Sequence, residues 1–111
     1  MSSTFKSEVS ASVGTSKTTV GTVPSGNAWT ILGLSVANTL STEISIDVYL
    51  YKASSTTEAA LGIALPVPVG SSLLIISDGQ KVIGEAGDEI RVESSDASSA
   101  DVVLSYLETV V

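Results

Sequence analysis

The sequence contains no cysteine and no histidine in its 111 residues. Without cysteine the fold does not rely on disulfide bonds or on an oxidising compartment. Without histidine the chain lacks the commonest metal ligand and the commonest general base. A chain of this length can bury a core without disulfides or metals. We therefore expect a protein with no cofactor and no metal ion.

Basic residues and long hydrophobic runs are also scarce. Five Lys and Arg stand against twelve Asp and Glu, so the formal net charge is −7. A chain this acidic is a poor match for a phosphate backbone, and we expect no nucleic-acid partner. Ser, Gly and Pro interrupt the apolar runs, and the start, MSSTFKSEVSAS, has no apolar segment of the length that a signal peptide needs. The sequence therefore predicts neither a signal peptide nor a membrane partner.

Val, Ile and Thr, which favour strands, are frequent along the whole chain. Turn signals return every ~8–12 residues, a spacing typical of a sandwich or barrel. We predict an all-β fold, a single small antiparallel β-sandwich of about eight or nine short strands. The polar, unpatterned start predicts a flexible N-terminal arm over residues 1–8, followed by the β-sandwich domain over residues 9–111.

The expected strands cover residues 6–13, 17–23, 28–37, 43–52, 58–65, 73–77, 80–83, 89–93 and 101–111. The strands over 73–77 and 80–83 flank Asp78-Gly79, a strong hairpin signal, so we expect them to pair with each other. Pro66 and Pro68 lack an N–H, which excludes residues 65–70 from a central strand and favours an edge or crossover segment.

The clearest pattern runs from Trp29 to Lys52. Ile44, Ile46, Val48 and Leu50 alternate with mostly polar residues, as in a strand with one buried face. Residues 28–37 are apolar on both faces, and Gly33 marks a bulge or a close approach of another backbone. The polar segment 38–42 between the two runs favours a turn. We expect this stretch to form the central β-hairpin of the protein.

Candidate sites for chemistry are weak. Glu85, Asp88 and Glu89 could offer oxygens to calcium, but their spacing matches no EF-hand loop and a solvated turn accounts for them better. Asp96 and Asp101 flank a Ser-rich loop and are explained by loop solvation. A glycosidase needs two placed carboxylates, but with twelve acids the presence of pairs discriminates nothing. The chain has no Gly-x-Ser-x-Gly elbow and no Ser-x-x-Lys motif, so we expect no enzyme.

Four large aromatic residues could form a binding patch: Trp29, Tyr49, Tyr51 and Tyr106. Trp29 lies beside a Pro-Ser-Gly-Asn turn and is better explained as a core or sheet-end anchor. Tyr49 and Tyr51 take the outward positions of the best-patterned strand, where they either cover sheet surface or form an interface. We weigh these two interpretations equally, and glycan binding less, because no polar clamp is evident.

The chain ends in Val110 and Val111 without a charged tail. This apolar end predicts that the C-terminus is held in a sheet or against a neighbour. Our candidate interface residues are therefore Tyr49, Tyr51, Val110 and Val111.

Several strand-and-turn motifs resemble those of a known group of proteins. In the second half these are LPVPVGSSL (65–73), GQKV (79–82), GDEIRV (87–92) and ADVVLSYLE (100–108). In the first half TVPSG (22–26), ILGLSVAN (31–38) and IDVYL (46–50) fit the same pattern. Over most of residues 18–108 the chain is similar to small virion structural proteins of tailed bacteriophages, including cyanophages.

The resemblance implies a β-sandwich structural protein of the particle and no active-site residue. It does not determine which part of the particle; the role we favour is a head decoration (cement) protein that stabilises the capsid lattice through contacts with its own copies and with the major capsid protein or other virion proteins. The expected location is the virion, assembled in the host cytoplasm. A tail, neck or fibre-associated component, with receptor or glycan contact, is the alternative.

Overall fold

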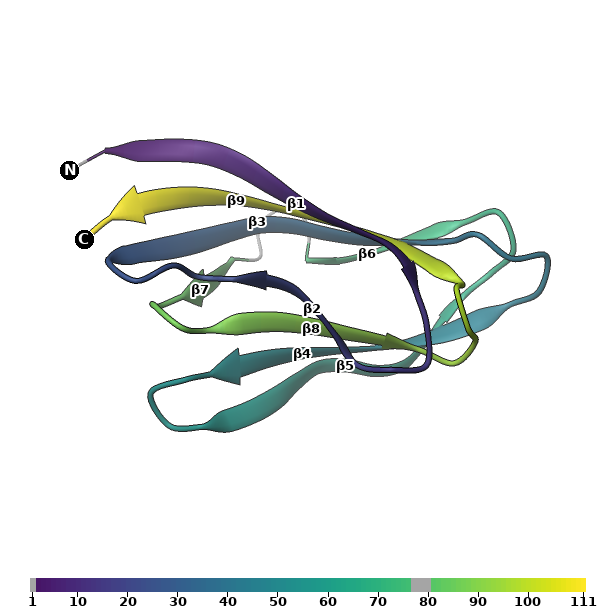
Figure 1. Ribbon diagram of the computed structural model, residues 1–111. Coiled ribbons are helices and arrows are strands. Elements are labelled where there is room, and N and C mark those ends of the chain that lie inside the picture. Colours follow the sequence, from purple (N-terminus) through teal and green to yellow (C-terminus); the bar gives the residue numbers. More distant parts are fainter. Residues whose placement is uncertain (1, 77–80) are drawn as a thin grey trace.

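The computed structural model describes residues 2–76 and 81–111. Within these ranges the chain forms nine strands and no helix. The strands pair antiparallel in two layers, which confirms the predicted all-β sandwich (Figure 1). The strand bounds are β1 Ser3–Val13, β2 Thr18–Thr22, β3 Asn27–Asn38, β4 Ile44–Lys52, β5 Thr57–Val67, β6 Ser72–Ile76, β7 Val82–Gly84, β8 Glu89–Ser94 and β9 Ala100–Val110.

Sheet A has the strand order β1-β9-β3-β6, and sheet B has the order β2-β8-β4-β5. In Figure 1 sheet A forms the upper layer and sheet B the lower layer. Strand β7 also pairs with β3, at residues 29–31, whereas β6 pairs with residues 34–37. The expected hairpin between residues 73–77 and 80–83 is therefore wrong, since both strands run along β3. Its turn, Asp78-Gly79, lies outside the described residues.

The expected hairpin from Trp29 to Lys52 is also wrong. Strand β3 lies inside sheet A and β4 lies inside sheet B, so residues 39–43 cross between the layers. Sheets in a sandwich pack ~10 Å apart, a gap that five residues span easily. Both strands have an apolar face, and placing them in opposite sheets buries both. Asn38 holds this corner: its Nδ2 donates to the carbonyls of Thr42 and Val67, and its Oδ1 accepts from Leu40 N.

A bulge at Gly33 corrects the expectation that β3 is apolar on both faces. The register against β9 shifts between Ile31 and Gly33. A one-residue shift moves the following side chains to the other face. Trp29 and Ile31 before the bulge, and Leu34 after it, are consequently all buried between the sheets. The predicted bulge is confirmed, and β3 has a single core face.

The core lies between the two sheets and contains the residues that the alternating pattern of β4 placed there. Ile44, Ile46 and Val48 are buried, and Leu50 is partly buried against them. Pro66 lies in β5, an edge strand of sheet B, in agreement with its missing N–H. Among the described residues there is no helix that is long and apolar enough to cross a membrane.

Residues 3–8, which we expected in a flexible arm, lie in β1. The pairing of β1 with β9 begins at Ser3 opposite Thr109 and continues through Glu8 opposite Leu104. The two chain ends therefore lie side by side at one end of sheet A (Figure 1). Because β1 is the outer strand of its sheet, whether this segment can leave the sheet and reach a neighbour stays a prediction.

Candidate interaction surfaces

Strand β1 turns Phe5 and Val9 away from the core, whereas Val13 at its end is buried. Phe5, the single phenylalanine of the chain, is 76% exposed, and Val9 is 67% exposed. Lys6 and Glu8 take the alternate positions and face the inner side of the sheet, where they meet polar groups of β9. Lys6 Nζ lies 2.7 Å from Glu108 Oε1, and Glu8 Oε2 accepts from the Tyr106 hydroxyl at 2.7 Å. In this part of β1 the apolar side chains face outward and the charged side chains face inward, which is the reverse of the usual arrangement in a sandwich strand.

The exposed residues of β1 continue across sheet A in cross-strand rows, because paired residues of antiparallel strands project to the same side. We call the surface made by three such rows the outer A face. One row runs Phe5, Leu107, Thr30 and Ile83; the middle row runs Ser7, Ser105 and Gly33; the third runs Val9, Val103, Ser35 and Leu74. Leu32, in the bulge, is also exposed.

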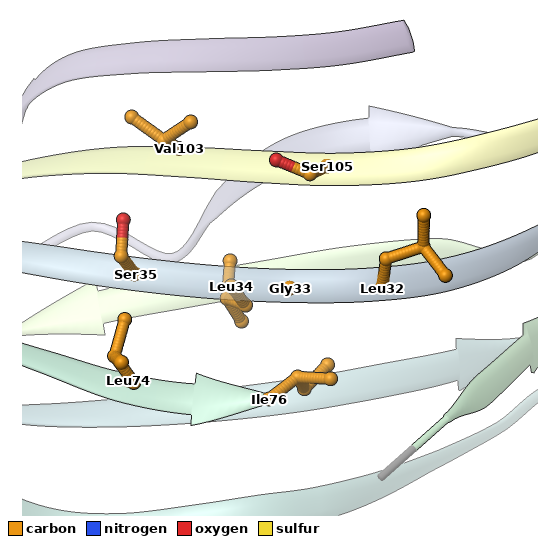
Figure 2. A pocket seen from close by; sticks show the side chains of 8 residues that line it. All are labelled: Leu32, Gly33, Leu34, Ser35, Leu74, Ile76, Val103 and Ser105. Atoms are coloured by element: carbon orange, nitrogen blue, oxygen red, sulfur yellow. The ribbon is translucent and has the colours of Figure 1, made fainter. Parts of the chain in front are cut away.

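A shallow hollow of about 270 Å³ lies in the middle of the outer A face, beside the bulge (Figure 2). It is lined by residues of β3, β6 and β9: Leu32, Gly33, Leu34, Ser35, Leu74, Ile76, Val103 and Ser105. Its polar groups are the two serine hydroxyls and backbone, and its walls are mainly aliphatic. Such a lining suits contact with an apolar surface and provides no acid, base or nucleophile pair.

None of the side chains in the three rows of the outer A face is charged. Asp101 lies beyond the rows at one end, where its Oδ1 accepts from Ser12 N at 2.9 Å. The outer side of sheet B is different, since it carries a network of ion pairs. Glu58 bridges Lys17 and Arg91 at 2.7 and 3.0 Å, and Arg91 also contacts Glu89 at 2.9 Å. The two outer surfaces of the sandwich therefore differ sharply in charge.

Tyr49 and Tyr51 lie within this charged network of sheet B. Lys17 Nζ sits 4.0 Å from the centre of the Tyr49 ring, and the Arg91 guanidinium sits 4.1 Å from the centre of the Tyr51 ring. Both tyrosines are half-buried. Cation–π contacts of this kind cover part of each ring. The structure thus gives both side chains partners within the chain, and their role in an interface stays a prediction.

Val110 and Val111 lie at one end of sheet A, beside the N-terminus. Val110 N donates to the Ser2 carbonyl at 3.1 Å, and Val111 N donates to the Gly26 carbonyl at 2.9 Å. The Val111 side chain remains 73% exposed and borders a hollow of about 530 Å³ whose other walls come from residues 27–28, 54 and 85–86. The C-terminus is held by backbone hydrogen bonds, and its contact with a neighbour stays a prediction.

In the acidic cluster at residues 85–89, Asp88 links the end of β4 to the turn before β8. The Asp88 carboxylate is buried and accepts from Lys52 Nζ at 2.5 Å, from Ala53 N at 3.0 Å and from Glu85 N at 2.9 Å. Burial raises the pKa of Asp88, but these hydrogen bonds outweigh it and hold the pKa below its usual range. Glu89 contacts Arg91 and Thr19. The carboxylates are thus occupied by protein donors.

The remaining candidates are also explained by contacts within the chain. The Trp29 and Tyr106 rings stack in the core with centroids 3.8 Å apart, and Trp29 Nε1 donates to Glu108 Oε2 at 2.9 Å. Burial, followed by the hydrogen bond to Glu8, raises the pKa of Tyr106 far above its usual range. Asp96 accepts from Ser95 within its loop. In the part of the chain that the structure describes, no three His, Cys, Asp or Glu residues are grouped to hold a metal ion.

The outer A face escaped prediction from the sequence, although a signal for it exists. In residues 3–10 the apolar residues Phe5 and Val9 are four positions apart and share one parity, while Lys6 and Glu8 occupy the alternate parity. The alternation indicates two different faces but not which one points outward. Which face points outward depends on whether sheet B covers β1. Because β1 pairs at the outer edge of sheet A, sheet B leaves most of this strand uncovered.

No protein-family model matches the chain, and no curated protein matches it. Among solved structures the chain is similar to one described as a cyanophage Pam1 capsid asymmetric unit, with 17% sequence identity and a TM-score of 0.46. The match covers 98% of this chain and 85% of the other. A similarity at this level carries no argument about function, which we base on the surfaces described above.

Proposed function

We propose that this chain is a non-enzymatic structural protein of a tailed-bacteriophage virion, and more specifically a head decoration protein that stabilises the capsid lattice. The observation that carries the proposal is the outer A face, an uncharged and largely apolar surface on a chain of net charge −7. Surfaces of this kind on small domains serve protein contacts. The resemblance of the strand and turn motifs to small virion proteins supplies the setting.

A decoration protein works by burying surface at many equivalent positions of a symmetric shell. Each contact can be modest, because a subunit that touches several neighbours gains through multivalency. The described residues support this mode better than catalysis: the hollows have mainly apolar or separated polar linings, and the buried carboxylate of Asp88 is committed to backbone and Lys52 donors. The acidic remainder of the surface favours solubility and repulsion between particles.

The proposal is tested on virions that carry the protein, separated into heads and tails. Expected is retention on tail-less heads, at a copy number that matches the shell lattice. Heads stripped of the protein should be disrupted at a lower temperature, and adding the purified protein back should restore the original value. Absence from heads together with retention on tails would contradict a decoration role and support the tail or neck alternative.

A further inference from the structure

We propose that the outer A face is the contact surface between two copies of this chain, packed face to face. The inference deepens the proposed function, in which the protein contacts its own copies, by naming the surface that does so. It starts from the exposure of Phe5 and Ile83, at 76% and 56%, which lie at opposite edges of the sheet in the same cross-strand row. Exposed apolar side chains that extend across a whole sheet are typical of a surface that a partner covers.

Charge favours a second copy as that partner. Each chain carries a net charge of −7, so two copies repel each other wherever acidic surfaces meet. Sheet B and the loops at residues 85–88 and 95–99 carry acids, and Asp101 lies beyond the rows at one end of sheet A, whereas the three rows of the outer A face carry none. Contact through this face keeps the charged network around Glu58 and Arg91 on the far side of each sandwich. The outer A face is therefore the part of the described surface where two copies meet at the smallest electrostatic cost.

The outer side of sheet A is large enough for a stable contact. Strands β1, β3 and β9 contain 11, 12 and 11 residues. With ~3.3 Å per residue and ~4.8 Å between strands, the whole outer side of sheet A covers roughly 700 Å², and the three rows of the outer A face, which make up roughly 320 Å² of it, are its centre. Two copies packed over this whole side bury about 1,400 Å², which is within the standard range for specific protein complexes. A contact limited to one strand edge would bury far less.

The order of residues in the rows suits a two-fold contact. The row from Phe5 to Ile83 and the row from Val9 to Leu74 both have large apolar residues at their two ends. A two-fold axis along the strands, between β9 and β3, reverses the strand order across the contact. Phe5 of one copy then faces Ile83 of the other, and Val9 faces Leu74. A surface that matches itself in this way satisfies the requirement of an isologous interface.

The purified protein tests this by sedimentation velocity over a range of concentrations. Expected is a concentration-dependent dimer, which Ile83→Ser weakens by about tenfold or more in dissociation constant, since a two-fold contact loses the side chain twice. The matched control is Ile63→Ser: Ile63 is also an isoleucine and 53% exposed, but lies in β5 of sheet B. It should leave the dimer unchanged. A monomeric wild-type protein, or equal weakening by the two variants, would overturn the proposal.

A charge pair tests the geometry. Phe5→Glu and Ile83→Lys should each be monomeric because each buries an unpaired charge, and their mixture should form a heterodimer in which Glu faces Lys. A mixture without a heterodimer overturns the two-fold arrangement. These measurements need no virion, so they are separate from the test of the decoration role. A protein that is monomeric yet retained on heads overturns the face-to-face contact alone, and a dimer that is absent from heads overturns the decoration role alone.

Discussion

Lys52 Nζ lies 2.5 Å from Asp88 Oδ2, and the Asp88 carboxylate is buried whereas Lys52 remains partly exposed. The pair joins the end of β4 to the turn before β8, and Asp88 also accepts from the backbone of Ala53 and Glu85. Gly87, in the same turn, takes a φ of 90°, which favours glycine. One carboxylate thereby fixes two connections of sheet B.

We predict that Asp88→Asn lowers the free energy of unfolding by about 2–3 kcal/mol, since it removes the charge that Lys52 neutralises and turns an amide N–H₂ toward backbone N–H donors. Glu85→Gln is the matched control. Glu85 contacts the same lysine at 2.8 Å but is 68% exposed, so its loss should cost less than ~0.5 kcal/mol. Urea unfolding at pH 7 measures both variants. Equal losses would show that burial of Asp88 is not what matters.

The stability of the protein should fall in acid. The pKa of Asp88 in the folded chain lies below its usual range, and that of an unfolded aspartate is about 3.9. A lowered pKa adds stability above the unfolded value, and this stability is lost as the pH falls through the folded value. The pKa values of Glu58 and Glu108 are also lowered, chiefly by hydrogen bonds from Lys17 to Glu58 and from Lys6 to Glu108. Urea midpoints measured between pH 7 and pH 3 should decrease below about pH 4 to 5, and less steeply in Asp88→Asn.

Ile46→Asp should abolish folding. Ile46 is fully buried at the centre of β4, and a carboxylate there would have no partner. Circular dichroism should show loss of the β spectrum at 25 °C. Ile63→Asp, at an exposed position of β5, should keep the wild-type spectrum. A folded Ile46→Asp protein would contradict the placement of this residue in the core.

The sheet B surface can be tested separately from the outer A face. Tyr49→Ala combined with Tyr51→Ala should leave the circular dichroism spectrum intact, because both rings lie on the outer side of sheet B under Lys17 and Arg91. If these tyrosines contact the particle, the double variant should be retained less on heads. Normal retention by a folded double variant would rule out their role as an interface.

Local pattern predicted the strands well and their partners poorly. The alternation from Ile44 to Leu50 determined both the strand and its buried face, and Pro66 correctly marked an edge position. The pairing of β3 with β4 failed because a short polar link can either close a hairpin or cross between layers. The corner bonds of Asn38, which involve Val67 from a distant strand, are not visible in local sequence.

For the outer A face, too, local sequence pattern and tertiary structure each determined a different part. The sequence by itself determined that β1 has an apolar and a polar side, since side chains alternate along any strand. It also determined that the chain is acidic and contains no cysteine and no histidine. Only the tertiary structure decided that Phe5 and Val9 point outward, because β1 is the outer strand of sheet A and sheet B does not cover it. The bulge at Gly33, which places Trp29 and Leu34 on one face, was likewise settled by pairing with β9.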